Sequence, residues 1–481
     1  MFVFTELLLI ASGGASGSSC HLPPLLPHQP VKRQTDRSQK AELQPCPGGR
    51  VAQRETPRHH HGFAYTCTLH EESSYMTELP DENQAAELRN KVVDQLKEDG
   101  TIVSPGVEAA MRKVPRHLAV PEASLGDAYS TYNAVVTQED EHGNHTSSVS
   151  APQVQAMQLE QADVSPGDNV LEIGTNGPNA AYLAELAGST GQVTTVDIDP
   201  APAARSERFL ADTGYTGVNV VVADAEDGYA KHAPYDAIVV TAGAWDIPPA
   251  WIEQLKDDGR LVVPLRINGL SRSYRFVRQD DHLVSTSAHV CGFVPVQGAG
   301  SHAQQAMQLP GDRGVTLHFD EGPPADPSLL NGVLDTERAE TWTGVTVASQ
   351  EPIGTLQMYL AAHVPTYCSM SIDRELATGR IGPTGLGFSM VAIDGANFGY
   401  IVVRRDTEKK TAEFGFHAFG PDGEAFAERL ADIVRDWGRD YRRGPSPLIA
   451  VYPAGTPDDR ITGDRIIDKE HSRISISWPV A

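Results

Sequence analysis

Short apolar segments alternate with helical segments between residues 128 and 300, and this alternation constrains the fold more than any other feature. The apolar segments are NVLEI, QVTTVDI, VNVVVAD, DAIVVTA and RLVVPL. Helical segments such as NAAYLAELAG and PPAWIEQLKDDG stand between them. Strands that are apolar on both faces and separated by helices are typical of a parallel sheet covered on both sides. We therefore predict a doubly wound α/β domain over residues 128–300.

The segments on either side of this run of strands have different patterns. Residues 76–127 are helical in pattern, with Leu88, Val92, Val93 and Leu96 on one face, and we expect them to cover the sheet. After RLVVPL, the segments SYRFVRQ, HLVSTSAHV and GFVPVQ follow one another with no helix between them. Strands joined without helices are typical of antiparallel pairing. We therefore predict an antiparallel edge that closes this sheet.

Residues 341–481 contain further strands, namely FSMVAID, YIVVRR, EFGFHAF and PLIAVYP. The segment GEAFAERLADIVRDWGRDYRRG places Phe426, Leu430 and Trp437 on one face at helical spacing. We predict a C-terminal α+β domain in which this helix packs on a sheet of those four strands. Residues 301–340 are rich in Gly, Pro and Asp, which predicts a connector between the two domains.

The first 75 residues differ in composition from the rest of the chain. They are rich in Gly, Ser and Pro, and such segments bury too little apolar surface to offset the entropy of ordering. We expect residues 1–75 to be disordered, or to be an extension created by a misplaced translation start, with Met76 opening a helix. The start MFVFTELLLI has no basic residue before its apolar run and carries Glu6 within it, unlike a secretory signal peptide.

Charge and cysteine content exclude several classes of function. The 63 acidic and 39 basic residues give a net charge of −24, which repels a nucleic-acid backbone. No apolar run approaches the ~20 residues needed to span a bilayer, so we expect no membrane insertion. The five cysteines lack the spacing of metal ligands. We therefore expect reduced thiols, a cytoplasmic protein and no bound metal ion.

A strand, a glycine turn and a helix follow one another in NVLEIGTNGPNAAYLAEL. In a doubly wound sheet such a turn directs backbone N–H groups at a ligand. Gly174 and Gly177 allow close approach of the backbone, and Asn176 is among the few other residues that tolerate a left-handed conformation. Asp197 ends the next strand, where it suits ribose hydroxyls, and Asp224 ends the following one, where it suits an adenine amine. These features fit NAD and S-adenosylmethionine equally.

The order of the other motifs distinguishes between these two cofactors. PRHLAVP, SSVSAPQVQAM, VLEIGT, VDIDP, ADAEDG, YDAIVVTAGAWDIPPAW and GFVPVQG occur in this order between residues 110 and 298. The chain thereby resembles protein-L-isoaspartate O-methyltransferases, and the SAP segment coupled to EIGT is specific to that family among methyltransferases. The resemblance implies a class I methyltransferase fold and S-adenosyl-L-methionine as the cofactor. It also implies a peptide or protein substrate with an aspartyl or isoaspartyl carboxylate.

The resemblance implies roles for individual residues as well. Ser150 corresponds to the serine at the methyl-transfer site and is the candidate catalytic residue. The candidate cofactor-binding residues are Ser147, Ser148, Val149, Glu172, Gly174, Thr175, Asn176, Gly177, Asp197, Asp224 and Ala225. Gln155 and Trp245 are expected to line the substrate site.

Three departures from the family pattern concern the substrate more than the cofactor. The turn is one residue shorter, with Pro178 where an aromatic residue is common. Gln155 stands where the repair enzymes usually carry a histidine, and Ala225 replaces a glycine.

Some of these residues also have a purely structural interpretation. Ser150 precedes Ala151 and Pro152, so it suits the N-cap of a helix that begins there. Asp199 suits a turn or a cap better than a ligand contact. Trp245 suits buried packing as well as it suits a substrate cleft.

A narrower group within the family shares the SSVSAP segment, the shortened turn, the AWDIPPAW run and a C-terminal extension. It comprises methyltransferases associated with ribosomally made, post-translationally modified peptides, including lanthipeptide-type clusters. Resemblance to this group implies esterification of an aspartate in a modified precursor peptide, leading to an aspartimide or isoaspartate, with residues 341–481 recognising the substrate. Two alternatives remain open. One is a repair methyltransferase for isoaspartyl residues in damaged proteins, and the other is a non-catalytic peptide-binding protein with a degenerate cofactor loop.

Overall fold

The computed structural model describes residues 82–349, 351–382 and 389–479. The predictions for residues 1–75 and for Met76 lie outside these ranges. The helices of the described residues are α1 (Glu82–Glu98), α2 (Pro105–Lys113), α3 (Leu125–Ala128), α4 (Pro152–Ala162), α5 (Pro178–Ala187), α6 (Pro200–Asp212), α7 (Pro249–Glu253), α8 (Gly354–His363) and α9 (Gly423–Asp436).

The strands of the described residues form three sheets. The smallest is a hairpin of β1 (Val135–Glu139) and β2 (His145–Val149). The ten-stranded sheet contains β3 (Asn169–Ile173), β4 (Gln192–Asp197), β5 (Asn219–Val222), β6 (Tyr235–Val240), β7 (Leu255–Ile267), β8 (Leu270–Gln279), β9 (His282–Val290), β17 (Leu448–Pro453), β18 (Arg465–Asp468) and β19 (Ser472–Ser477). The seven-stranded sheet contains β10 (Gln305–Gln308), β11 (Val315–Phe319), β12 (Ala339–Ala348), β13 (Thr366–Ile372), β14 (Met390–Asp394), β15 (Asn397–Asp406) and β16 (Thr411–Phe419).

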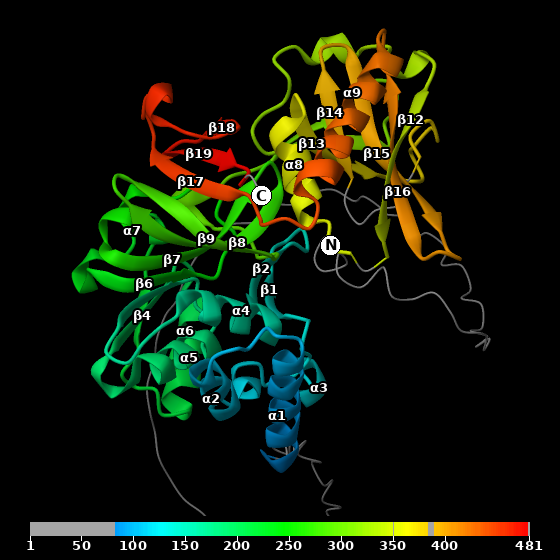
Figure 1. Cartoon of the computed structure of the whole chain (residues 1–481). Helices are drawn as coiled ribbons and strands as arrows, with labels where there is room; N and C mark the ends of the chain where they lie inside the picture. Colours follow the sequence, from blue (N-terminus) through cyan, green and yellow to red (C-terminus); the bar gives the residue numbers. More distant parts are fainter. Residues whose placement is uncertain (1–81, 350, 383–388, 480–481) are drawn as a thin grey trace, which may run out of the picture. The chain divides into compact units, whose positions relative to one another are not determined.

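The parallel half of the ten-stranded sheet has the order β7-β6-β3-β4-β5, and β7, β6 and β4 can be followed in Figure 1. The chain moves outward from β3 through β4 to β5, and then crosses to the other side of β3 to form β6 and β7. This is the doubly wound arrangement that the alternating segments predict. The direction of winding reverses between β3 and β6, and ligands of such sheets bind beyond the carboxyl ends of the strands at this point.

Successive residues of the central strands enter two separate cores. Val170 of β3 and Val239 of β6 pack with α1, α2, α4, α5 and α6 on one face. Leu171 of β3 and Val240 of β6 pack with Trp251 of α7 on the other face. Because both faces are covered, these strands are apolar at nearly every position.

The helical cover predicted over residues 76–127 is present from Glu82 onward, as α1, α2 and α3. Val92, Val93 and Leu96 of α1 are buried, and Leu88 packs beside them. The helix predicted in PPAWIEQLKDDG is shorter than expected, since α7 ends at Glu253. The residues after it begin β7, where Leu255 is buried and pairs with Tyr235.

The antiparallel part of this sheet is larger than the sequence predicts. β8 pairs antiparallel with β7 and β9 pairs antiparallel with β8, as expected, but GFVPVQ contributes only an isolated bridge between Pro295 and Gly243. β9 does not end the sheet, because β17 pairs with it and β19 and β18 follow (Figure 1). The predicted placement of PLIAVYP in the C-terminal sheet is therefore wrong. It is β17, and it extends the catalytic sheet.

The seven-stranded sheet confirms the other three predicted C-terminal strands. β14, β15 and β16 are neighbours, and α9 packs on β12, β15 and β16 (Figure 1). The α9 face predicted from helical spacing is the buried one, with Phe426, Leu430 and Val434 in the core. Trp437 follows in a π-helical turn and is also buried.

The connector predicted over residues 301–340 contributes two strands to this sheet, so that prediction is wrong. β11 pairs with β10 and β13, and its residues Val315, Leu317 and Phe319 are buried. The segment VTLHF alternates in the way a half-buried strand does. It is only five residues long, and the Gly and Pro residues around it hide that signal.

None of the helices within the described ranges is both long enough and apolar enough to cross a membrane.

Candidate functional site

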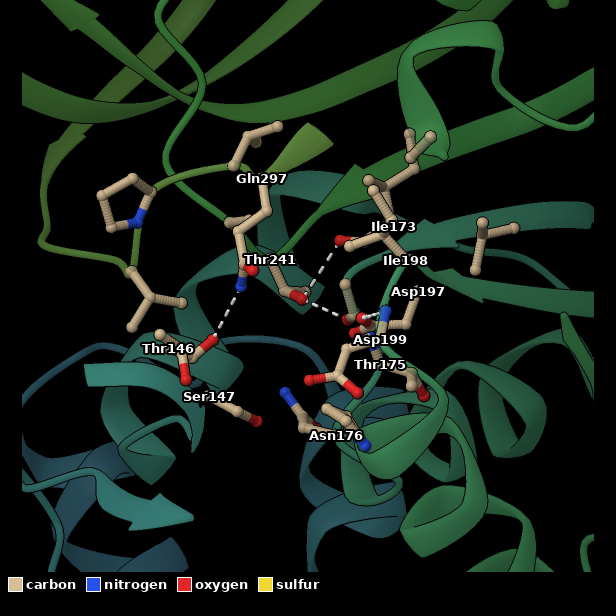
Figure 2. A pocket seen from close by; sticks show the side chains of 18 of the residues that line it. Thr146, Ser147, Ile173, Thr175, Asn176, Asp197, Ile198, Asp199, Thr241 and Gln297 are labelled. Carbon is tan, nitrogen blue, oxygen red and sulfur yellow. Dashed lines mark hydrogen bonds between the residues drawn. The ribbon is translucent and has the colours of Figure 1, made fainter. Parts of the chain in front are cut away.

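A pocket lies at the carboxyl ends of β3, β4 and β6, at the point where the winding of the sheet reverses (Figure 2). Its empty space, including the part open to solvent, is ≈ 640 Å³. The lining residues are Thr146, Ser147, Ser148, Ile173, Gly174, Thr175, Asn176, Val196, Asp197, Ile198, Asp199, Pro202, Ala225, Thr241, Ala242, Val294, Pro295, Val296 and Gln297.

The turn after β3 requires glycine at two positions for different reasons. Gly174 has φ +89°, and a Cβ there would lie 2.8 Å from the Thr241 Oγ1 atom. Gly177 has φ +79°, and a Cβ there would lie 2.9 Å from Cδ1 of Phe209 on α6. Gly174 thus brings backbone into the pocket, while Gly177 lets α5 begin against α6 and does not line the pocket.

The Asp197 carboxylate lies in the pocket and organises the turn (Figure 2). It accepts hydrogen bonds from the backbone N–H of Thr175 at 3.0 Å and of Asp199 at 2.9 Å. Burial raises its pKa above the ordinary value. A carboxylate has about four acceptor positions, so acceptor capacity remains for a hydroxyl group of a ligand.

Asp199 is a helix cap, as its position in VDIDP predicts. It is the N-cap of α6, and its side chain accepts from the Ala201 backbone at 2.8 Å. It also lines the pocket and accepts from the Gln138 side chain at 2.9 Å. Asp199 therefore ties the β1–β2 hairpin to the pocket.

The serine-rich segment forms another side of the pocket. Ser147 and Ser148 line it, and Thr137 of β1 donates to the Ser147 hydroxyl at 2.9 Å. The Gln297 side chain donates to the Thr146 carbonyl at 3.2 Å across the pocket mouth (Figure 2). Val149 does not line the pocket, because its side chain is buried in the core beneath the helical cover.

Ser150 is buried directly after this segment and is not among the lining residues. Its carbonyl accepts from the Arg116 guanidinium at 3.0 Å. The N-cap of α4 is Ala151, which makes no side-chain capping bond. The interpretation of Ser150 as the cap of this helix is therefore wrong.

The two residues expected to line the substrate site do not line this pocket. Gln155 is buried, its Oε1 accepts from Arg116 at 2.6 Å, and its Nε2 lies 3.5 Å from the Asn176 Oδ1. Trp245 stacks on His302 at 3.8 Å between ring centroids, with the Lys469 ammonium 4.7 Å from its ring. Gln155 supports the turn, and Trp245 packs against the C-terminal part of the chain.

Asp224 and Ala225 are neighbours in the sequence but differ in their position relative to the pocket. Ala225 lines the pocket, whereas Asp224 does not. The Asp224 carboxylate accepts from the backbone of Glu226 at 3.0 Å and of Ala299 at 2.8 Å. A Cβ on Gly298 would lie 2.4 Å from that carboxylate. Asp224 therefore holds the segment after GFVPVQ against this loop.

Glu172 lies beneath the pocket and does not line it. Its carboxyl group is buried between β3, β4 and α5, where Thr195 donates to it at 2.6 Å and Asn179 at 2.8 Å. Burial raises its pKa to about 7. Glu172 is a structural support for the turn.

Relative to the wild type, a Glu172→Gln variant is expected to become more stable as pH rises, because the wild type loses stability. The folded state favours the protonated acid, so the wild type loses stability between the unfolded pKa of about 4.5 and the folded pKa of about 7, whereas the amide does not titrate. The shift corresponds to about 3 kcal/mol. Denaturant unfolding of both proteins at pH 5 and pH 8 measures the difference, with exposed Glu207→Gln as control. An equal difference at both pH values would contradict the assignment.

Several pocket residues are not predicted by the sequence motifs. Thr241 and Ala242 follow β6, and the rule that strand ends carry ligand contacts would have found them. The segment Val294–Gln297 follows β9 and has little regular structure. No local signal places it beside Thr146.

The pocket residues fit S-adenosylmethionine. The glycine turn exposes backbone, the Asp197 carboxylate has free acceptor positions for ribose hydroxyls, and Ile198 and Val296 supply apolar surface for a base. Ser147 and Ser148 are on the side that leads to Ser150.

Comparisons with known proteins agree with this geometry. Residues 87–301 match the family described as protein-L-isoaspartate(D-aspartate) O-methyltransferase. A protein-L-isoaspartate O-methyltransferase of Archaeoglobus fulgidus is 38% identical over 216 residues, which cover 44% of this chain and 94% of that protein. The enzyme of the same name from Pyrococcus horikoshii is 36% identical over 223 residues, covering 46% of this chain and 97% of that protein.

Solved structures with related titles also align with the chain. One titled protein-L-isoaspartate O-methyltransferase covers 81% of this chain and 100% of its own length at 19% identity, with a TM-score of 0.44. A Plasmodium falciparum structure titled as a putative member in complex with S-adenosyl-L-homocysteine covers 44% and 98% at 17% identity, with a TM-score of 0.39.

Proposed function

The chain belongs to the protein-L-isoaspartate O-methyltransferase family, and from this premise we propose that it esterifies the side-chain carboxylate of an aspartyl or isoaspartyl residue in a peptide. It is an S-adenosylmethionine-dependent carboxyl O-methyltransferase with the class I methyltransferase fold. The observation that carries the proposal is the pocket itself. It joins the cofactor turn and Asp197 to the serine-rich segment that ends at Ser150.

Methylation of a carboxylate requires the protein mainly to position the reacting groups. A carboxylate with an ordinary pKa of about 4 is already anionic at neutral pH, so the reaction requires no strong base. The bound cofactor supplies a methyl group activated by its sulfonium charge. The protein must remove water from the carboxylate and hold one oxygen in line with that methyl group, and such orientation contributes about 7–11 kcal/mol.

In our proposal, two groups of residues hold the cofactor and the acceptor carboxylate in place. The turn from Gly174 to Asn176 and the Asp197 carboxylate hold the cofactor. Ser150 and the backbone N–H groups beside it hold the second carboxylate oxygen. The product ester is a better acyl electrophile than the carboxylate, so the backbone N–H of the following residue attacks it. That step releases methanol and closes a succinimide.

For the acceptor, we propose an aspartate of a modified, conformationally constrained peptide. Two features support this proposal, namely the SSVSAP and AWDIPPAW segments of the narrower group and the seven-stranded sheet added to the catalytic domain. A constrained peptide loses less entropy on binding and presents one carboxylate in a fixed direction. The second candidate is an isoaspartyl residue of a damaged protein, which the names of the relatives favour.

Mass spectrometry of peptides incubated with enzyme and S-adenosylmethionine tests both acceptors. We expect a gain of one methyl group, followed by loss of methanol, on the modified peptide encoded near the gene, and little on a linear isoaspartyl peptide. Ser150→Ala should lower turnover while cofactor affinity stays within about twofold, since its partner is the acceptor. Efficient methylation of the isoaspartyl peptide alone would establish the repair function instead. No methylation of either peptide would contradict the proposed function.

A further inference from the structure

The guanidinium group of Arg116 lies behind the segment assigned to the acceptor. Its side chain is buried, with 2% exposure. It donates to the Ala128 carbonyl at 2.7 Å, to the Gln155 side-chain oxygen at 2.6 Å and to the Ser150 carbonyl at 3.0 Å. One side chain thus joins the helical cover, the helix after the serine-rich segment and Ser150 itself.

All three of these acceptors are neutral. Among the described residues, no carboxylate pairs with Arg116, whereas the half-buried Arg266 pairs with Asp320 at 2.8 Å. The titratable groups that act on Arg116 are the phenols of Tyr129 and Tyr182, whose own pKa values burial raises, so they stay neutral. An arginine remains charged even in such a place. A buried charge without an anionic partner is costly, and this one lies behind the segment that is proposed to hold the acceptor carboxylate.

We propose that Arg116 is a positioning residue for the acceptor, which fixes the Ser150 carbonyl and provides an uncompensated positive charge that attracts the substrate carboxylate. This inference rests on the proposed function. The neutral amide of Gln155 is part of the arrangement, because it satisfies the guanidinium without cancelling its charge. A glutamate at the same position would cancel it.

The charge balance of the reaction determines which kinetic constant depends on Arg116. A carboxylate anion attacks a methyl sulfonium cation, the carbon–sulfur bond breaks with its electron pair on sulfur, and a neutral ester and a neutral thioether result. The acceptor therefore loses negative charge on the way to the transition state. A nearby cation stabilises the bound substrate more than the transition state, so it lowers KM without raising kcat.

The decisive variant is Gln155→Glu, which keeps the guanidinium and its anchoring and adds a negative charge where Oε1 now lies 2.6 Å from Arg116. We expect KM for the acceptor peptide to rise about tenfold or more, with kcat unchanged or higher. Gln155→Met is the matched control, because it loses the same contact with Asn176 but adds no charge. The KM of Gln155→Glu should therefore exceed that of Gln155→Met by about tenfold or more.

Substitutions of the arginine provide a second comparison. Arg116→Gln should raise KM as Gln155→Glu does, and Arg116→Lys, which keeps a charge, should restore most of the affinity. Arg112→Gln, on α2 where the guanidinium pairs with Asp94 of α1, should change neither constant. Calorimetric titration of the acceptor peptide and of its asparagine analogue into the complex with S-adenosyl-L-homocysteine gives the same comparison without turnover. In Gln155→Glu and Arg116→Gln, binding of the carboxylate peptide should weaken, whereas binding of its asparagine analogue should not.

The outcomes separate this inference from the proposed function. If the wild type methylates a peptide and Gln155→Glu has the KM of Gln155→Met, Arg116 has no electrostatic role and the inference is wrong. A fall in kcat and in cofactor affinity with unchanged KM would assign Arg116 a structural role only, which also overturns it. If the wild type neither binds nor methylates a carboxylate peptide, the proposed function fails and this inference fails with it.

Discussion

An Asp197→Ala variant is expected to lose about 100-fold or more in affinity for S-adenosylmethionine. The carboxylate faces the pocket and also holds the Thr175 and Asp199 N–H groups that shape it. The substitution removes hydrogen bonds to the ligand and leaves two turn donors without acceptors. Bonds to a charged group contribute about 1.5–3 kcal/mol each, and 1.4 kcal/mol corresponds to tenfold in affinity.

Calorimetric titration with the cofactor measures this loss. Asp197→Asn distinguishes charge from shape, because the amide retains one acceptor oxygen and should lie between the alanine variant and the wild type. Asp212→Ala, at an exposed position at the end of α6, is the matched control and should bind normally. Equal cofactor binding by Asp197→Ala and the wild type would remove the pocket from the proposed site.

The parallel half of the catalytic sheet could be predicted from sequence because its residues face two cores at once. Val170 and Leu171 are neighbours that enter opposite cores, so the strand is apolar throughout and easily recognised. Because these strands are parallel, their carboxyl ends meet at the same edge of the sheet. That rule alone places Gly174, Thr175 and Asp197 at the pocket, where the structure has them.

Three residues predicted for the site make contacts that depend on distant segments. Asp224 does end a strand, but the Ala299 backbone, 75 residues later, occupies its carboxylate. The Gln155 side-chain oxygen accepts a hydrogen bond from Arg116, which belongs to the helical cover. Trp245 is flanked by His302 and Lys469. None of these partners lies near the residue in sequence, so local pattern carries no information about them.

The position of β17 shows the same limitation on a larger scale. PLIAVYP has the pattern of a buried strand, and the pattern does not specify its partner. The structure pairs β17 with β9 of the catalytic sheet and with β19. Ile449, Val451, Ile474 and Ile476 are consequently fully buried in the core that also contains Leu261 and Phe276.

Polar contacts fix the same C-terminal strands to the catalytic domain. The Lys469 ammonium is buried and donates to the carbonyls of Trp245 at 2.5 Å and Arg266 at 2.7 Å. The His471 backbone donates to Asp246 at 2.6 Å, and its ring lies 3.1 Å from the Glu226 carboxylate beside the pocket. The end of the chain is therefore part of the catalytic domain, and a truncation at residue 341 would damage that domain as well as the C-terminal sheet.

Deletion of residues 447–481 is consequently expected to abolish folding of the catalytic domain, even though these residues follow the family-matched region. It removes three strands, leaves β9 as an unpaired edge and exposes an apolar core surface, a combination that favours aggregation. The measurements are soluble yield, the thermal unfolding transition and cofactor binding. Ile474→Ala provides a milder version that should fold but lose about 2–5 kcal/mol, while Arg465→Ala, exposed on β18, should lie within about 0.5 kcal/mol of the wild type. A truncated protein that stays soluble, unfolds at the wild-type temperature and binds the cofactor would show that the strands are an independent addition.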